Sequence, residues 1–411
     1  MNVALIFGGR SPEHEVSIVT AHQVNAALSE THDVIPIYIT KDGAWLTGDK
    51  LNELNTFTEG TLPHANDFDS VSIEFETSAK FTVLPKRSGF FSKKRELSID
   101  VVFPAIHGVN GEDGSLQGLL ELMDIPYVGA GVVGSGVGMD KIMMKAVLNE
   151  NGLPIVPYIP FTKHDWDSAN KEIINVIEET MPYPMYVKPA ISGSSIGVSQ
   201  VKGQDELHDA IELACRYSRR IIVEQAIQNG YEINCSVMGT HEPTASVCEQ
   251  PISSTDFLSF DDKYIHENSD AESNADVTPE SNVTTGMAGA QREIPAPISD
   301  ELTLHIQKLA TDAFHILDCT GIARIDFLVD SEEQVYVNEI NTVPGSFSFY
   351  LWEPIGISFP ELVSQLVMLA IETHQEKNRL IYSYSTNLLS QAGASFGKLK
   401  GNDNSKPEET T

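Results

Sequence analysis

Four polar residues near residue 330 have the types and the spacing of a cation-binding site. The segment GIARIDFLVDSEEQVYVNEIN (321–341) has two apolar-rich stretches around a Ser-Glu-Glu-Gln loop, which is typical of a β-hairpin. If Asp330 pairs with Val335, the alternation of side chains along both strands gathers the polar groups on one face. That face carries Arg324, Asp326, Glu339 and Asn341. The other face, which can be buried, carries Ile325, Phe327, Tyr336 and Ile340.

This pairing places Asp326 directly opposite Glu339. Facing carboxylates repel each other unless a cation lies between them. Carboxylate and amide oxygens suit Mg²⁺, which also binds nucleotide phosphates. The turn Asn-Thr-Val-Pro-Gly (341–345) follows at once and can place a backbone N–H beside the pair. We therefore predict a metal site here rather than a solvated hairpin face.

A second segment, VKPAISGSSIGV (187–198), has the composition of a phosphate-binding loop. A strand carries Lys188 and turns through Gly193-Ser194-Ser195, whose backbone N–H groups can fold over phosphates. Lys141 opens the preceding predicted helix. Each lysine alone is typical of a protein surface, but together with the hairpin they predict a nucleotide site.

Another glycine-rich stretch, GAGVVG (129–134), matches the G-x-G-x-x-G fingerprint, with Glu150 near the expected acidic offset. That fingerprint normally follows the first strand of a dinucleotide-binding domain. Here it follows about 128 residues of other structure, so a nicotinamide or flavin site is the weaker interpretation. The sequence contains no G-x-x-x-x-G-K-[ST] motif, which excludes a P-loop ATPase.

The composition limits the partners and the compartment. A balance of 27 Lys+Arg against 58 Asp+Glu gives a formal net charge of −31, which disfavours nucleic acid and anionic membranes as partners. The four cysteines form no Cys-x-x-Cys pair, as expected in a reducing compartment. The N-terminus does not resemble a signal peptide, and no run of eighteen apolar residues occurs. We expect a cytoplasmic protein.

Apolar patterning predicts the elements that position these motifs. Over the first 128 residues, strands and helices alternate as in an open α/β domain, with strands at 3–7, 34–39 and 99–106 and helices at 16–29 and 115–123. Further strands are expected within 185–202 and at 220–225, 231–239, 244–250, 322–329 and 335–340. Further helices are expected at 139–151, 205–218, 300–317 and near 360–373. The stretch from Ser253 to about Ile298 lacks periodicity and predicts a lid with a disordered insert.

Seven motifs in order resemble one known family. They are FGGRSPEHEVS (7–17), HGVNGEDGSLQG (107–118), MDK (139–141), VKPAISGSSIGV, DDKY (261–264), ARIDF (323–327) and NEINTVPG (338–345). Together they resemble the D-alanine–D-alanine ligases of the ATP-grasp superfamily, from residue 1 to about 375. The resemblance implies a mixed α/β and α+β fold with three domains. These are an N-terminal α/β substrate domain (1–129), a central ATP-grasp subdomain (130–224) and a C-terminal ATP-grasp subdomain with lid and metal site (225–376), before a largely polar tail (377–411).

The resemblance also implies an activity. The carboxylate of a first D-alanine attacks the γ-phosphate of ATP to give an acyl phosphate, and the amine of a second D-alanine then displaces phosphate. The dipeptide would serve peptidoglycan synthesis. Mg²⁺ or Mn²⁺, with two ions expected, would act with ATP. A homodimer is expected.

The family motifs assign roles to individual residues. The metal ligands would be Asp326, Glu339 and Asn341. The nucleotide would contact Lys141 and Lys188 at its α- and β-phosphates, Lys263 at its γ-phosphate, Glu224 at adenine and Glu232 at ribose, with Ser195 and Asn338 also close. Glu13 would bind the ammonium of the first substrate, linked to Ser194 and Tyr264, and His107 would lie near its carboxylate. Arg324 and the Gly345 N–H would form an oxyanion hole.

Three features depart from the family pattern. Where the family usually offers a small hydroxyl residue to the second substrate, this chain has SFSFYLWE (346–353), with Tyr350 and Leu351 at the substrate position. Ile191 replaces a residue that is often basic or an amide. An acidic insertion (266–284) follows Tyr264, and we expect it to be mobile and not catalytic.

Several functions stay open at this point. The Lys-Tyr pair of the predicted lid favours an amine as nucleophile over D-lactate, although His266 is close by, and D-serine remains a candidate acceptor. A non-catalytic nucleotide-binding protein would lack some of Lys263, Arg324, Asp326 and Glu339, and all four are present. A dehydrogenase rests on GAGVVG alone.

Overall fold

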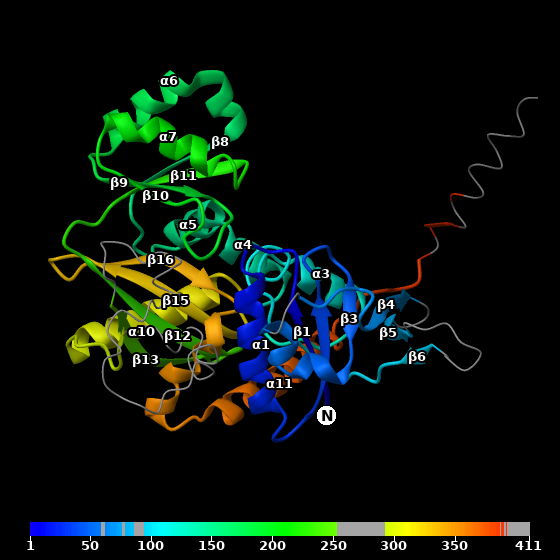
Figure 1. Cartoon of the computed structure of the whole chain (residues 1–411). Helices are drawn as coiled ribbons and strands as arrows, with labels where there is room; N and C mark the ends of the chain where they lie inside the picture. The colour runs from blue at the N-terminus through cyan, green and yellow to red at the C-terminus, as the bar shows by residue number, and fades with distance from the viewer. Residues whose placement is uncertain are drawn as a thin grey trace, which may run out of the picture. The chain divides into compact units, whose positions relative to one another are not determined.

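The computed structural model describes residues 1–58, 62–75, 79–85, 94–252, 292–386, 388, 389 and 392. Contacts divide the chain into a large unit, Met1–Thr373, and a small one, His374–Thr411. Residues 253–291 of the stretch predicted as a lid, which include the acidic insertion, and most of the tail lie outside the described residues. The three sheets of the large unit provide the framework for the site (Figure 1).

The first sheet has seven strands and belongs to the N-terminal part of the chain. From one edge to the other they are β6 (Arg95–Glu96), β5 (Ala79–Leu84), β4 (Asp69–Phe75), β3 (Trp45–Thr47), β2 (Asp33–Ile39), β1 (Asn2–Gly8) and β7 (Val101–Pro104). β1 is parallel to both of its neighbours, β2 and β7. From β2 to β6 the pairing is antiparallel. The predicted alternation of strand and helix therefore holds for β1, β2 and β7, whereas the antiparallel half was not predicted.

β1 is apolar because both of its faces are covered. Its odd-numbered residues pack in one core with α1 (His14–Leu28), and its even-numbered residues pack in another with α3 (Ser115–Leu122). A continuous apolar strand of this kind is typical of a central parallel position. Two short helices, η1 (Asp49–Asn52) and α2 (Asn55–Thr58), connect β3 to β4.

The second sheet has four antiparallel strands. They are, in order, β10 (Ser199–Val201), β9 (Met185–Pro189), β11 (Arg220–Gln225) and β8 (Tyr158–Thr162). Helices α6 (Lys163–Thr180) and α7 (Gln204–Ala214) cover one face (Figure 1). Ile142 of α5 (Lys141–Glu150) packs against Ala190 and Ile222 on the other.

The helix predicted at 139–151 is α5 (Lys141–Glu150), and a second helix that was not predicted, α4 (Val132–Met139), precedes it. Asp140 lies between the two helices. The Asp140 carboxylate accepts hydrogen bonds from the N–H groups of Ile142 and Met143, both at 3.1 Å. A side-chain oxygen at this position satisfies N–H groups that have no partner within the helix. This N-cap makes Lys141 the first residue of α5.

The third sheet has five antiparallel strands. They are β14 (Arg292–Glu293), β13 (Thr244–Pro251), β12 (Tyr231–Gly239), β15 (Gly321–Val329) and β16 (Val335–Asn341). Helix α10 (Asp300–Ile316) packs on β12, β13 and β15. The predicted domain limits at 129, 224 and 376 stay predictions.

The last segments of the large unit return to the first sheet. They are η3 (Gly345–Leu351), η4 (Glu353–Ile355) and α11 (Phe359–Lys377). Phe347 of η3 contacts Phe103 of β7, with ring centroids 4.9 Å apart. Within the described ranges, no single helix is long and apolar enough to cross a bilayer, although the bent pair Gly345–Ile355 and Phe359–Lys377 passes jointly by length and composition.

Candidate active site

The predicted hairpin is β15 and β16. Val329, rather than Asp330, pairs with Val335, so the register at the turn differs by one residue from the expected one. A bulge at Asn338 adds one residue to β16 and restores the expected partners further along. The strands therefore pair Asp326 with Glu339 and Arg324 with Asn341.

The bulge corrects one expectation. Tyr336 was predicted on the buried face, but it pairs with Leu328 and lies on the same face as Asp326. Because side chains alternate with a period of two, an extra residue moves every preceding side chain to the opposite face. The Tyr336 side chain is half-buried, and its hydroxyl lies 3.5 Å from Oδ2 of Asp330.

Arg324 and Asp326 form a buried pair on this face. Nε and Nη2 of Arg324 donate to the two carboxylate oxygens of Asp326 at 2.7 and 2.8 Å. Nδ2 of Asn341 donates to Oδ2 of Asp326 at 3.0 Å. Burial by itself lowers the pKa of Arg324, but the Asp326 carboxylate outweighs burial and the pKa is raised. On the other side of β15, Glu232 of β12 pairs with Leu328, which places it on the same face.

Glu13 precedes α1 and is almost completely buried. Its carboxylate accepts a hydrogen bond from the Ser194 hydroxyl, 181 residues away in the sequence. Two glycines lie in close contact with it. A Cβ added at Gly108 would lie 2.4 Å from Oε2 of Glu13, and one added at Gly193 would lie 2.6 Å from it. Side chains at those two positions would displace the carboxylate.

The loop after β9 has an unusual backbone. Ser194 and Ser195 have φ angles of 49° and 61°, the left-handed region that residues with a side chain rarely adopt. Such strain is common at functional sites. Left-handed turns also aim consecutive N–H groups at one point, which suits an anion.

Three lysines approach this region from α5 and β9. Nζ of Lys141 donates to the Ser192 carbonyl oxygen at 2.9 Å and lies 3.3 Å from Oε2 of Glu339. Nζ of Lys188 donates to Oε2 of Glu224 at 2.7 Å. Nζ of Lys145 lies 3.3 Å from the other oxygen of Glu224.

Lys145 and Glu224 are fully buried. Burial opposes the charge of Glu224, yet the adjacent lysines, Lys145 first, lower its pKa to about 2. Burial lowers the pKa of Lys145. For Lys188, burial also lowers the pKa, but the carboxylates of Glu224, Glu339 and Glu232 reverse the direction and raise it. Carboxylates from both the second and the third sheet thus stabilise the charged form of Lys188.

His107 and Glu112 lie on the loop after β7. Nε2 of His107 is 2.9 Å from the Thr20 hydroxyl. Complete burial lowers the pKa of His107 to about 4, despite a hydrogen bond to the backbone of Val343, so the ring is neutral at pH 7. For Glu112, burial and the neighbouring Glu13 raise the pKa to about 8.

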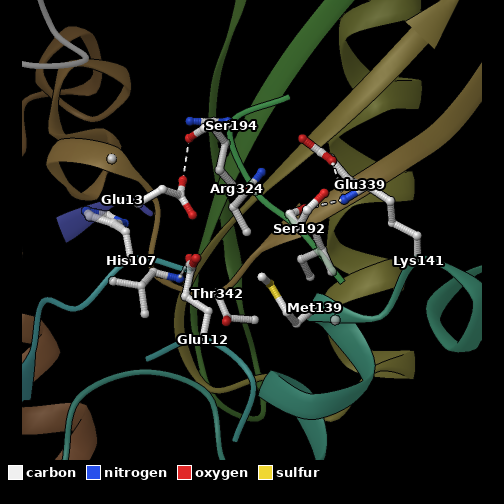
Figure 2. Close-up of a pocket in the computed structure, with 16 residues that line it drawn as sticks. Glu13, His107, Glu112, Met139, Lys141, Ser192, Ser194, Arg324, Glu339 and Thr342 are labelled. Atoms are coloured by element: carbon white, nitrogen blue, oxygen red, sulfur yellow. Dashed lines mark hydrogen bonds and ion pairs between the residues drawn. The ribbon is translucent and has the colours of Figure 1, made fainter. Parts of the chain in front are cut away.

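Several of these groups, from the loop after β7, the loop after β9 and the strands of the third sheet, line one cavity. Figure 2 shows Glu13, His107 and Glu112 on one side and Lys141 and Glu339 on the other. Of the predicted site residues, the cavity is lined by Glu13, His107, Lys141, Ser194, Arg324, Glu339, Asn341 and Gly345.

The predicted metal ligands fit a divalent cation by their chemistry. Two carboxylates, Asp326 and Glu339, face each other across adjacent strands beside the Asn341 amide. Protein cations contact both carboxylates, Arg324 on one and Lys141 on the other. No group of three or more His, Cys, Asp or Glu suited to a metal occurs among the described residues, and the predicted set contains only two such residues.

Other predicted residues lie elsewhere. Leu351 is fully buried in the core, and Tyr350 is almost fully buried, with its hydroxyl 3.4 Å from Oε1 of Glu249. The guanidinium of Arg292 lies 4.1 Å from the centre of the Tyr350 ring. Neither Tyr350 nor Leu351 is among the described residues that line the cavity. Lys263 and Tyr264 lie outside the described residues.

The GAGVVG stretch has a packing role. Gly131 precedes α4, and Gly134 lies against the chain before β15, where an added Cβ would be 3.0 Å from the Asp318 carbonyl oxygen. Just before it, Tyr127 forms a β-bridge with Val102 of β7. The stretch therefore does not follow the first strand of a dinucleotide-binding domain.

Comparison with known proteins decides the family. Two family models match, "D-ala D-ala ligase N-terminus" over residues 2–130 and "D-ala D-ala ligase C-terminus" over 147–288 and 284–368. The chain belongs to the D-alanine–D-alanine ligase family. This ligase is 38% identical to the D-alanine–D-alanine ligase of Thermosipho africanus, covering 94% of this chain and 98% of the relative. It is 40% identical to that of Natranaerobius thermophilus, covering 92% and 97%.

Solved structures agree with this assignment. The D-alanine–D-alanine ligase from Coxiella burnetii is 30% identical, with a TM-score of 0.73 over 92% of this ligase and 97% of that chain. The VanG D-Ala:D-Ser ligase from Enterococcus faecalis is 29% identical, with a TM-score of 0.72 over 90% and 99%. The ligase therefore has the ATP-grasp fold, and the resemblance seen in the motifs is confirmed.

Lys145 and Glu112 are two buried charged residues of this ligase that sequence reasoning missed. Lys145 lies four residues after Lys141, on the same face of α5, between the buried Met144 and Leu148. A lysine among apolar neighbours was the available signal. Glu112 lies in the HGVNGEDG loop, where nothing in the spacing distinguishes it from the adjacent Asp113.

Proposed function

We propose that this ligase joins two D-alanine molecules to D-alanyl-D-alanine through an acyl phosphate. The observation that carries the proposal is the composition of the cavity. One side offers the buried Glu13 carboxylate, and the other offers Arg324, Lys141 and the Glu339 carboxylate. An amino acid can thus be bound by its ammonium group while its carboxylate faces cationic groups.

The first substrate would be oriented by charge. Glu13 would bind its ammonium group, and the buried carboxylate is already held by Ser194. Arg324 and the Gly345 N–H would donate to the carbonyl oxygen as it becomes an oxyanion. Pre-oriented donors in a site that excludes water stabilise such charge strongly. Arg324 suits this role because Nε and Nη2 fix its plane against Asp326.

Phosphoryl transfer would be supported by the lysines. Lys141 and Lys188 would bind the α- and β-phosphates, with the N–H groups of the Ser194–Ser195 turn beside them. Asp326, Glu339 and Asn341 would hold Mg²⁺ or Mn²⁺, two ions being expected, and the metal would neutralise charge on the β- and γ-phosphates. Glu224 would contact adenine and Glu232 ribose, with Asn338 and Ser195 nearby. Both Glu224 oxygens already contact lysines, which fixes the carboxylate in place.

The remaining predictions concern closure, assembly and compartment. An acyl phosphate hydrolyses readily, so Lys263 and Tyr264 on a lid would exclude water. We further propose a homodimer in the cytoplasm. All four cysteines are free, which suits a reducing compartment.

D-Serine is the second candidate for the acceptor, because a structure of almost equal likeness is a D-Ala:D-Ser ligase. The Tyr350 hydroxyl lies close to Glu249 rather than in the cavity. The family's usual hydroxyl contact to the second substrate would therefore have to come from elsewhere in this chain.

The test is phosphate release from ATP with Mg²⁺ and a panel of D- and L-amino acids, singly and paired, with mass spectrometry of the product. We expect D-alanine alone to suffice and L-alanine to give nothing. A faster reaction with D-alanine plus D-serine, giving the mixed dipeptide, would replace the proposal with the second candidate. Absence of any dipeptide would refute both.

A further inference from the structure

Glu112 joins two segments of the active site that are far apart in the sequence. Its side chain lines the cavity (Figure 2) and is buried. Oε2 accepts a hydrogen bond from the Gly108 N–H at 2.7 Å, and Oε1 accepts one from the Val343 N–H at 3.2 Å. One carboxylate thus connects the loop after β7 to the turn after β16, 231 residues later.

The Val343 end of this connection lies two residues before Gly345. The backbone of Val343 also hydrogen-bonds to the His107 ring. Beyond Gly345, the Ser346 N–H points to the Thr20 hydroxyl at 3.5 Å, and this hydroxyl also contacts His107. The peptide of Gly345 is therefore held from both sides by groups of the N-terminal domain.

The Gly108 end of the connection lies against the Glu13 carboxylate. The N–H of Gly108 is held by Glu112, and its carbonyl oxygen accepts from the Glu112 N–H at 2.9 Å. The Gly108 backbone is so close to Glu13 that an added Cβ would lie 2.4 Å from Oε2. A shift of Gly108 would therefore change the space that Glu13 can occupy.

A buried carboxyl group is an unfavourable means of holding two N–H groups, because burial and the nearby Glu13 disfavour its charge and raise its pKa. Such an arrangement is better explained by a geometric requirement of the site than by stability alone. An α-amino acid has a fixed separation between its ammonium nitrogen and its carboxyl carbon. The site must therefore keep Glu13 and the Gly345 N–H at a matching separation.

We propose that Glu112 is a positioning residue that sets the separation between Glu13 and the Gly345 N–H. The inference rests on the proposed function, in which these two groups bind the ammonium and the oxyanion. It assigns Glu112 to the chemical step and not to nucleotide binding.

The experiment compares Glu112→Gln with a matched control, Asp113→Asn. The Asp113 carboxylate also accepts two backbone N–H groups, from Asn110 at 2.9 Å and Ser115 at 3.0 Å, but both belong to its own loop. Each amide variant presents an NH₂ group to one of the backbone donors. Only Glu112→Gln disturbs the connection to the 342–345 turn.

We expect Glu112→Gln to lower kcat for D-alanine ligation by about 10- to 100-fold, because misplacement of about 1 Å can lower a rate by about 100-fold. KM for ATP should stay within about twofold, since Lys141 and Lys188 are not touched. Asp113→Asn should retain kcat within about twofold. Melting temperatures of both variants separate a folding defect from a change in chemistry.

The proposal is wrong if the two variants lose kcat equally, if Glu112→Gln changes only the melting temperature, or if KM for ATP rises as kcat falls. Should Glu112→Gln not fold, Glu112→Asp keeps the carboxyl group but is too short to reach both N–H groups, and full activity in that variant would refute the proposal. A wild-type protein that forms no dipeptide would instead refute the proposed function, and this inference with it.

Discussion

Replacement of Lys145 by methionine tests the buried ion pair beneath the nucleotide site. Nζ of Lys145 lies 3.3 Å from the Glu224 carboxylate, and both side chains are at most 2% exposed. The shift of the Glu224 pKa from 4.5 to about 2 corresponds to about 3 kcal/mol at ~1.4 kcal/mol per unit. Among the charges that lower this pKa, that of Lys145 has the largest effect. Breaking a buried pair by removing one partner costs about 3–5 kcal/mol.

We therefore expect Lys145→Met to lower the free energy of unfolding by about 3 kcal/mol, measured by urea denaturation at pH 7. A carboxyl group with a lowered pKa in the folded state stabilises the protein above its unfolded pKa, and that stability is lost as the pH falls toward the folded value. For Glu224 this window lies between 4.5 and about 2. The loss should therefore be equal at pH 7 and pH 5.

Lys308→Met is the matched control. Nζ of Lys308 lies 2.8 Å from Asp312, and its side chain is 70% exposed. Exposed pairs of this kind contribute about 1 kcal/mol or less. If the two variants shift the urea midpoint equally, the Lys145–Glu224 pair does not have the strength inferred here.

Three further predictions address the cavity. Gly193→Ala should raise KM for the first D-alanine by about tenfold or more, because the new Cβ would lie 2.6 Å from Oε2 of Glu13. The melting temperature should change little, and an unchanged KM would contradict this prediction. Glu339→Ala should abolish turnover and weaken Mg²⁺-dependent ATP binding in calorimetry, whereas the exposed Glu332→Ala should not; full activity of the first variant would remove the metal assignment. The contribution of His107 to wild-type stability should fall as the pH drops from 6.5 to about 4, because unfolded His107 binds a proton there and the folded ring does not. The urea midpoint of the wild type relative to that of His107→Gln should therefore decrease over this range, and a difference between the two proteins that does not change with pH would contradict this.

The hairpin illustrates what the sequence can and cannot predict. A short polar loop and alternating side chains predicted the pairing of Asp326 with Glu339, which the structure reaches through a turn register that differs by one residue and a bulge that compensates for it. The bulge at Asn338 was not predicted, because nothing local distinguishes an extra residue in a strand from a shifted turn, and Tyr336 was placed on the wrong face as a result.

Two other omissions have different causes. Of the antiparallel strands, β3 and β6 have three and two residues, which leaves too little sequence for a period to be recognised. Glu112 and Lys145 act through partners that are distant in the sequence, Val343 and Glu224. Motif spacing reports neighbours along the chain, so contacts of this kind become visible only in the folded molecule.

The core that joins β1 to α11 has a consequence for how this ligase is made. Val3, Leu5 and Phe7 share one apolar cluster with Leu362, Val363 and Leu366. During synthesis the first strand emerges long before these partners. The apolar residues on one side of the sheet would therefore stay exposed to solvent until nearly the entire polypeptide has been made. An isolated fragment ending near residue 130 would leave that apolar surface permanently exposed, although a family model matches the segment as a unit. We expect such a fragment to aggregate where the full-length chain does not.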